Sequence, residues 1–123
     1  MQKTILTIFI RLGLFFIGPA MAAICPHPEL SGLNEGRVPA PWVLNPFSAK
    51  KPEAYLKSQF IRANILVAGV GLGVVCTYRN IEGFYSIWWQ EAVKIPAPSD
   101  NYWHRSLGGY ECTSELEACV FYI

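Results

Sequence analysis

The sequence predicts an all-β protein, folded as a small antiparallel β-sandwich or partly open barrel and stapled by two disulfides. Short runs of β-branched and aromatic residues, which are typical of strands, fill the second half of the chain. Links containing glycine, proline or asparagine separate these runs. All four cysteines lie after residue 22. About five to seven short strands in a domain of about 100 residues indicate a sandwich or a small barrel.

The first 22 residues have the features of a secretory signal peptide. Lys3 supplies the charged start, and residues 12–17 are an unbroken apolar core. Ala20 and Ala22 place small side chains at the −3 and −1 positions of a cleavage site. We therefore expect residues 1–22 to be removed, which leaves residues 23–123 as a single exported β-rich domain.

Two other fates of this segment stay open. An uncleaved membrane anchor would need roughly 20 apolar residues, and Arg11 interrupts the run. A lipid anchor on Cys25 would need a small residue before the cysteine, where Ile24 stands. Cleavage would make the protein periplasmic or secreted, without stable membrane insertion.

Cleavage also changes the charge of the protein. Removing Lys3 and Arg11 lowers the net charge from +1 to −1. No basic surface then remains that would bind nucleic acid or anionic lipid, so neither is an expected partner.

The even number of cysteines in an exported chain predicts two disulfides. Three pairings are possible, and we favour Cys25–Cys76 with Cys112–Cys119. The first ties the N-terminal segment to a core strand, and the second closes a short local loop. A metal site formed by Cys25, His27, Cys112 and Cys119 is the alternative, but the chain has no C-x-x-C pair and no common zinc spacing. No metal or cofactor is predicted.

The elements before the central strands are weakly specified. Residues 23–52 are rich in proline and glycine, so we expect them to be extended or looped, with short edge strands at best. Residues 42–44 are their one apolar anchor. Residues 53–59 fit either a short helix after Pro52 or the start of a strand.

Three strands are expected in the centre of the chain, at residues 60–68, 74–79 and 84–93. The glycine-rich residues 69–73 and the turn at 80–83 link them, and such short links favour an antiparallel meander. Alternation along the first strand predicts which side chains face the core. These are Ile61, Ala63, Ile65 and Val67.

The C-terminal part is expected to hold two more strands. Residues 96–101 form a loop, residues 102–107 a strand that ends at Gly108–Gly109, and residues 111–117 a polar turn. Residues 118–123 are apolar and predict a last strand buried in the sheet.

Nothing in this pattern specifies a reaction. The glycines at 69–73 are not followed by the glycine and helix that a dinucleotide site needs, because Val74 and a strand follow. His27 and His104 are the candidate bases, and no serine lies in a G-x-S-x-G setting. Three acidic residues near the C-terminus predict a solvated loop and not a glycosidase pair: Glu111, Glu115 and Glu117. We expect no catalytic residue and no enzyme.

Tryptophans are the candidate binding residues. Trp88 and Trp89 are adjacent on an expected strand, so they point to opposite faces of the sheet. One of them, or Trp103, could be exposed and bind a sugar or a protein.

Several short motifs resemble a known family. They are Cys25-Pro26 soon after the signal, residues 39–42 (Pro-Ala-Pro-Trp), residues 76–79 (Cys-Thr-Tyr-Arg) and Gly83. Over roughly residues 25–90, the chain resembles the EirA family of small exported, type IV secretion-associated proteins of intracellular Gram-negative pathogens. The resemblance implies a periplasmic β-rich protein without catalysis that supports secretion or replication in the host.

Three hypotheses of function follow. The leading one is a periplasmic, non-enzymatic protein that acts through contacts with a protein of the cell envelope. The alternative is a secreted ligand binder or inhibitor that uses an exposed aromatic surface. A small hydrolase would need His104 beside a carboxylate in a cleft. The sequence does not predict an oligomeric state.

Overall fold

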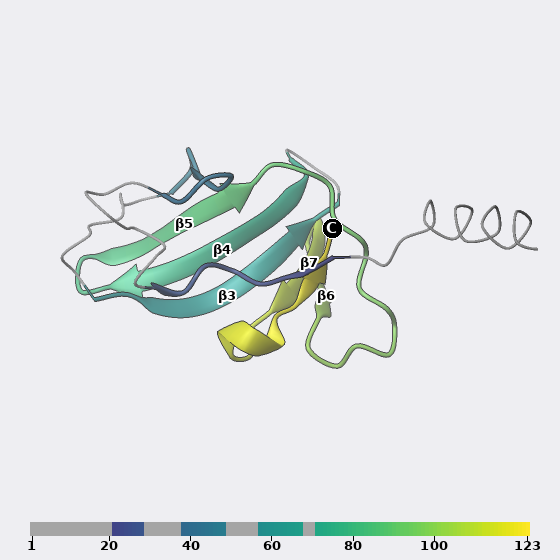
Figure 1. The fold of residues 1–123 in the computed structure, drawn as a ribbon. Helices are drawn as coiled ribbons and strands as arrows, with labels where there is room; N and C mark the ends of the chain where they lie inside the picture. The colour runs from purple at the N-terminus through teal and green to yellow at the C-terminus, as the bar shows by residue number, and fades with distance from the viewer. Residues whose placement is uncertain (1–20, 29–37, 49–56, 68–70) are drawn as a thin grey trace, which may run out of the picture.

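The computed structural model describes residues 21–28, 38–48, 57–67 and 71–123, and it confirms the all-β fold. Six strands form one antiparallel sheet in the order β2-β5-β4-β3-β7-β6, and β1 pairs with β8 in a second, two-stranded sheet (Figure 1). Neither sheet closes into a barrel, so the two-layer, sandwich-like alternative holds. The strands are β1 (Ala22–Ala23), β2 (Val43–Leu44), β3 (Gln59–Leu66), β4 (Gly73–Asn80), β5 (Gly83–Trp89), β6 (His104–Ser106), β7 (Gly109–Cys112) and β8 (Phe121–Tyr122).

The predicted signal peptide lies outside the described residues, except for its last two. Ala22 pairs with Tyr122, and the Met21 carbonyl accepts a hydrogen bond from the Ile123 amide. Cleavage after Ala22 would therefore leave only Ala23 of β1. Residues 53–56 of the ambiguous segment also lie outside the described residues.

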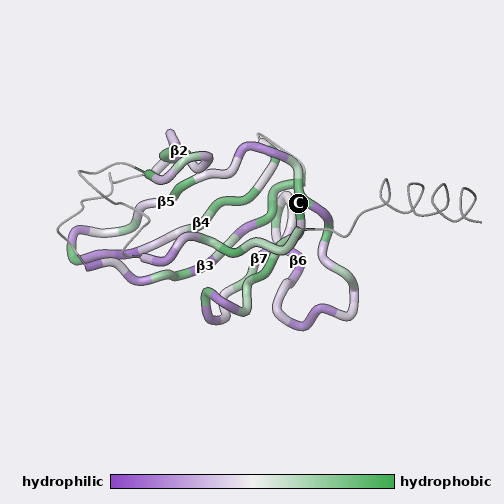
Figure 2. Tube along the Cα trace, viewed as in Figure 1, coloured by the Kyte–Doolittle hydropathy of each residue, from purple (hydrophilic) through white to green (hydrophobic). Residues whose placement is uncertain are grey.

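The predicted meander is confirmed. β3, β4 and β5 are antiparallel neighbours, and their hydrophobic stretches lie side by side in the sheet (Figure 2). β5 ends at Trp89 and not at Val93 as expected. The physical reason is the loss of a partner, because the ladder with β4 ends at the pair Val74–Trp89.

A β-bulge changes the expected alternation along β3. Ala63 and Ile65 are buried as predicted. The pairing with β4 shifts between Phe60 and Arg62, which leaves Ile61 as the extra residue. Phe60, expected on the other face, therefore packs against the core, with its ring 5.9 Å from the ring of Tyr78 in an edge-to-face contact. Val67, expected in the core, lies beyond the end of β3 and is 39% exposed.

The prediction missed β7. Gly108–Gly109 does not end the sheet: Gly108 adopts a φ of 81° in a hairpin turn, and Gly109 begins a strand between β3 and β6. A Cβ on Gly109 would lie 1.8 Å from the carbonyl oxygen of Ile65, so the close approach of β7 to β3 requires glycine. The turn that Gly108–Gly109 predicted is present, but the strand that begins at Gly109 was not predicted.

The C-terminal strand differs from its prediction as well. A 3₁₀ helix, η2 (Leu116–Ala118), precedes β8, and β8 pairs with β1 and not with the larger sheet. Phe121 is buried, but Tyr122 and Ile123 are exposed. The reason is that β8 lies in the second layer, where only the side chain directed toward the larger sheet is covered.

Both predicted disulfides are present, and they hold the second layer on the sheet. Cys25–Cys76 ties the N-terminal segment to β4, and Cys112–Cys119 ties β7 to the segment before β8. Trp42, buried as the predicted anchor, contacts the Phe121 ring edge-on at 6.2 Å between ring centroids. One face of the six-stranded sheet, here called the core face, is thereby covered by residues 21–28 and by the C-terminal segment with β8.

Tyr78 links the two layers through a hydrogen bond, and its burial should make the folded protein less stable at alkaline pH. Its hydroxyl donates to the Pro26 carbonyl at 2.6 Å, and burial, reinforced by Tyr85, raises the pKa of Tyr78 well above its ordinary value. The unfolded state loses this proton from about pH 10 upward, whereas the folded state keeps it. The free energy of unfolding should therefore fall above about pH 10, by about 1.4 kcal/mol per pH unit from this residue.

The variant Tyr78→Phe should lose this contribution to the fall in the free energy of unfolding between pH 8 and pH 11, measured by urea unfolding. The exposed Tyr122→Phe is the control, and equal slopes in the wild type and Tyr78→Phe would contradict the assignment.

Candidate functional site

A cleft opens where the chain leaves the C-terminal segment at Tyr122 and later returns to it at Val120. The Lys94 amide donates to the Tyr122 carbonyl at 2.8 Å, and the Trp103 indole N–H donates to the Val120 carbonyl at 2.8 Å. Between these two hydrogen bonds, residues 95–102 arch away from the C-terminal segment (Figure 1). The space beneath this arch, here called the arch cleft, has a volume of about 910 Å³.

The arch has its own local order. Pro96 and Pro98 restrict the backbone, because proline holds φ near −65°. The Asp100 amide donates to the Ala97 carbonyl at 2.9 Å, which closes a turn. The Tyr102 amide donates to Asp100 Oδ1, also at 2.9 Å. Such an Asx turn fixes the Asp100 carboxylate relative to the Tyr102 backbone before any ligand binds.

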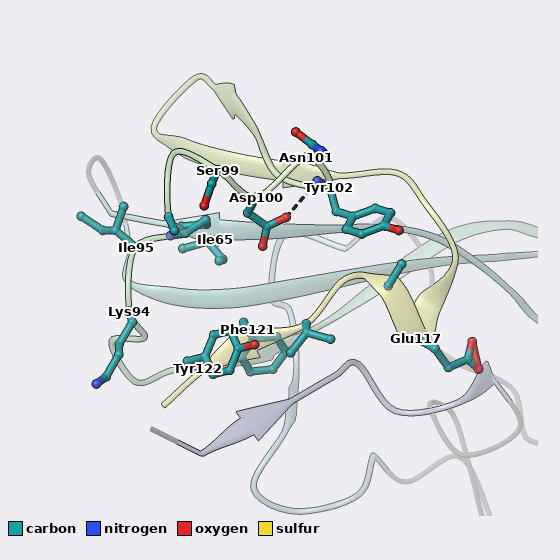
Figure 3. Close-up of a pocket in the computed structure, with 14 residues that line it drawn as sticks. Ile65, Lys94, Ile95, Ser99, Asp100, Asn101, Tyr102, Glu117, Phe121 and Tyr122 are labelled. Carbon is teal, nitrogen blue, oxygen red and sulfur yellow. Dashed lines mark hydrogen bonds between the residues drawn. The ribbon is translucent and has the colours of Figure 1, made fainter. Parts of the chain in front are cut away.

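The floor of the arch cleft is apolar and its rim is mixed. Ile65 of β3 and Phe121 of β8 are buried at its base. Ile95, Tyr102 and Tyr122 are exposed at its rim. Figure 3 shows the Asp100 side chain between the two walls, with one carboxylate oxygen directed toward the floor. An apolar floor with a few placed polar groups is the usual composition of a binding site.

The charged groups of the arch cleft are separated along its length. Lys94 lies at one end, and Glu117, from η2, lies near the other, with Asp100 between them (Figure 3). The lining therefore holds two carboxylates and one ammonium group. This distribution favours a ligand with a positive charge near Asp100.

The three predicted tryptophans lie elsewhere. Trp88 and Trp89 do point to opposite faces of the sheet, as expected for neighbours on a strand. The Trp88 indole is half-buried and donates to the Leu72 carbonyl at 2.8 Å. Trp89 lies on the core face, where its ring contacts Trp42 at 5.6 Å between centroids. Trp103 is 6% exposed, and its indole holds the base of the arch. Its contribution to the arch cleft is therefore structural.

The sequence predicted the loop at residues 96–101, but it did not indicate that this loop lines a cleft. The exposed aromatic residues of the cleft are tyrosines, Tyr102 and Tyr122, and not tryptophans. The available signal was the combination of a proline-bounded loop, an Asp-Asn pair and a following tyrosine.

The residues considered for catalysis are dispersed. His27 is exposed near the N-terminal end of the described chain, and His104 is exposed on the edge strand β6. His104 does lie opposite Glu111 of β7 in the strand pairing. Glu115 and Glu117 are exposed around η2, as predicted for a solvated loop, but Glu111 is half-buried on β7, so the prediction that it belongs to this loop was wrong. Within the described ranges, no three His, Cys, Asp or Glu side chains group closely enough to hold a metal ion.

The described residues contain no helix that is long and apolar enough to cross a membrane.

Comparisons of this chain with family models, with curated proteins and with solved structures found no match.

Proposed function

We propose that this protein is an exported, non-enzymatic binding protein that acts through contacts with another protein, made at the arch cleft. The observation that supports this most directly is the form of the cleft. Exposed aliphatic and aromatic side chains surround an apolar floor, and hydrogen bonds to Val120 and Tyr122 hold the two ends of the arch. Rigid aromatic side chains lose little conformational entropy on binding, which makes them effective anchors in protein interfaces.

The proposed compartment is the periplasm or the space outside the cell. The two disulfides support it, because such cross-links persist in oxidising compartments. The resemblance to the EirA family points in the same direction and extends the proposal to a partner in the cell envelope. That partner would belong to, or act beside, a type IV secretion system or another process that supports replication inside a host.

A second candidate function is a secreted binder of glycans or an inhibitor. Tyr102 and Tyr122 offer aromatic faces, and Asp100 and Asn101 offer planar carboxylate and amide groups to hydroxyls in the same cleft. Aromatic faces that stack on sugar rings are a common way to bind glycans.

Site-specific photocrosslinking in the native host tests the proposal. A benzoylphenylalanine residue replaces Tyr102 at the arch cleft or, as a control, the exposed Ile81 at the turn between β4 and β5. The expected result is one envelope protein crosslinked from Tyr102 and not from Ile81. The same band from both positions, or none from Tyr102, would contradict a protein partner at this cleft.

Filling the arch cleft should abolish that crosslink. Ser99 lines the cleft and is exposed, so Ser99→Trp should place an indole at its mouth without disturbing the core. We expect at least about a tenfold loss of the crosslinked product, a loss typical of a blocked interface. Thr113→Trp, exposed and outside the cleft, should leave the yield unchanged. If Ser99→Trp crosslinks normally but loses binding on a glycan array, the second candidate function is favoured.

A further inference from the structure

We infer that the arch cleft recognises an arginine side chain presented by an extended segment of the partner protein, with Asp100 as its anchor. The inference rests on the proposed function and specifies the chemistry of the partner. Three features of the cleft support it. They are the Asp100 carboxylate oxygen that has no hydrogen-bond partner among the described residues, the neighbouring Tyr102 ring and the apolar floor.

Asp100 uses only one of its carboxylate oxygens within the described structure. Oδ1 accepts the Tyr102 amide at 2.9 Å, and the other oxygen faces the interior of the arch cleft (Figure 3). Asp100 is half-buried, so a cation bound there is partly shielded from water. Hydrogen bonds between charged partners are about twice as strong as neutral ones.

Tyr102 adds a surface that suits a planar cation. Its ring is 51% exposed and lies beside the Asp100 carboxylate in Figure 3. A guanidinium group can bond a carboxylate through its edge while its face stacks on an aromatic ring. The Asx turn holds the Asp100 carboxylate on the backbone amide of Tyr102, which keeps the carboxylate close to the residue that carries the ring. Lysine, with a compact ammonium group, has no planar face to stack on the ring while it bonds the carboxylate.

The floor accommodates the rest of the side chain. The methylene stem of an arginine can pack on the half-buried Ala118 and Val120 while its head reaches Asp100. Lys94 opposes a cation only at the far end of the cleft, and Figure 3 shows its ammonium group directed away from Asp100. Glu117, on the facing wall, adds a second negative charge. The volume of about 910 Å³ exceeds one side chain, so flanking residues of an extended segment would fill the remainder.

A matched pair of tripeptides tests the charge requirement. The oxidised, exported protein is titrated with acetyl-Val-Arg-Val-amide and with its citrulline analogue, which keeps the shape of arginine but is neutral. Backbone amide shifts in NMR spectra give both the affinity and the location. We expect shifts at Asp100, Tyr102 and Phe121, and about tenfold weaker binding of the citrulline peptide, as the loss of one charged hydrogen bond predicts.

Two variants complete the test. Asp100→Asn keeps the oxygen that accepts the Tyr102 amide but removes the charge, so it should weaken the arginine peptide about tenfold and leave the citrulline peptide unchanged. Glu91→Gln removes the same charge at an exposed position outside the cleft and should change neither affinity.

Each other outcome overturns the inference. These are equal affinities for the two peptides, equal losses in Asp100→Asn and Glu91→Gln, shifts located away from the arch cleft, and no binding of either peptide at millimolar concentration. The inference and the proposed function can fail separately. A crosslink from Tyr102 with no preference for arginine would leave the function intact, whereas the absence of that crosslink would remove the function itself.

Discussion

Removing the Cys25–Cys76 disulfide is expected to destabilise the protein by about 4 kcal/mol, the value that the chain-entropy model assigns to a loop of this length. The two cysteines are 51 residues apart, and the bond holds the N-terminal segment on β4. Both sulfurs are buried, so the double variant Cys25→Ala/Cys76→Ala also leaves space in the core. Since small domains are stable by about 5–15 kcal/mol, this loss would remove from about a quarter to about four-fifths of the total stability.

The second disulfide is the matched control. Cys112→Ala/Cys119→Ala opens a separation of only 7 residues, for which the same model gives about 2.5 kcal/mol. Urea unfolding of both double variants, followed by tryptophan fluorescence, measures the difference. An equal loss in the two variants would show that the length of the closed loop does not govern the stabilisation.

Gly73→Ala is expected to destabilise the protein by at least about 3 kcal/mol, through backbone strain and overpacking together. Gly73 begins β4 with a φ of 108°, a conformation that side chains rarely adopt. A Cβ placed there would lie 1.8 Å from the carbonyl oxygen of Trp89. This oxygen belongs to the backbone of β5, so it cannot move aside without disrupting the β4–β5 ladder.

Gly71→Ala is the comparison for Gly73→Ala, because it should crowd a side chain and not the backbone of β5. Its Cβ would lie 2.6 Å from the ring of Trp88, which is a side chain and can shift. We expect a loss of about 1–2 kcal/mol, which is the lower part of the range for overpacking. Thermal unfolding of the two variants should therefore differ clearly in midpoint. Similar midpoints would mean that β5 tolerates displacement at Trp89.

The central meander could be predicted because its signals are local. The strand around Ala63 alternates in hydropathy, the strand around Ile87 is rich in aromatic residues that favour strands, and short links allow adjacent strands to pair. The boundaries of β5 and the faces of β3 were wrong in part. A strand ends where its neighbour ends, and one extra residue at Ile61 reverses the alternation before it. Neither effect is visible in a single segment of sequence.

The site was harder to predict because exposure depends on the packing of distant segments. Trp103 is a surface candidate by sequence, but it is buried, and its indole N–H donates a hydrogen bond to the Val120 carbonyl, 17 residues away. Tyr102, its neighbour, is exposed at the rim of the arch cleft. Adjacent aromatic residues thus have opposite roles, and only the position of β8 distinguishes them.

The sequence by itself determined the all-β class and the central meander, and among three possible disulfide pairings it favoured the one that the structure contains. Each of these follows from periodicity, turn residues or loop length, which are properties of the chain read in order. Only the tertiary structure decided that β7 lies inside the sheet, that β8 joins β1 in a second layer, and that residues 95–102 arch over Phe121. These arrangements depend on contacts between segments far apart in the chain, where close backbone approach and burial, and not local propensity, set the free energy.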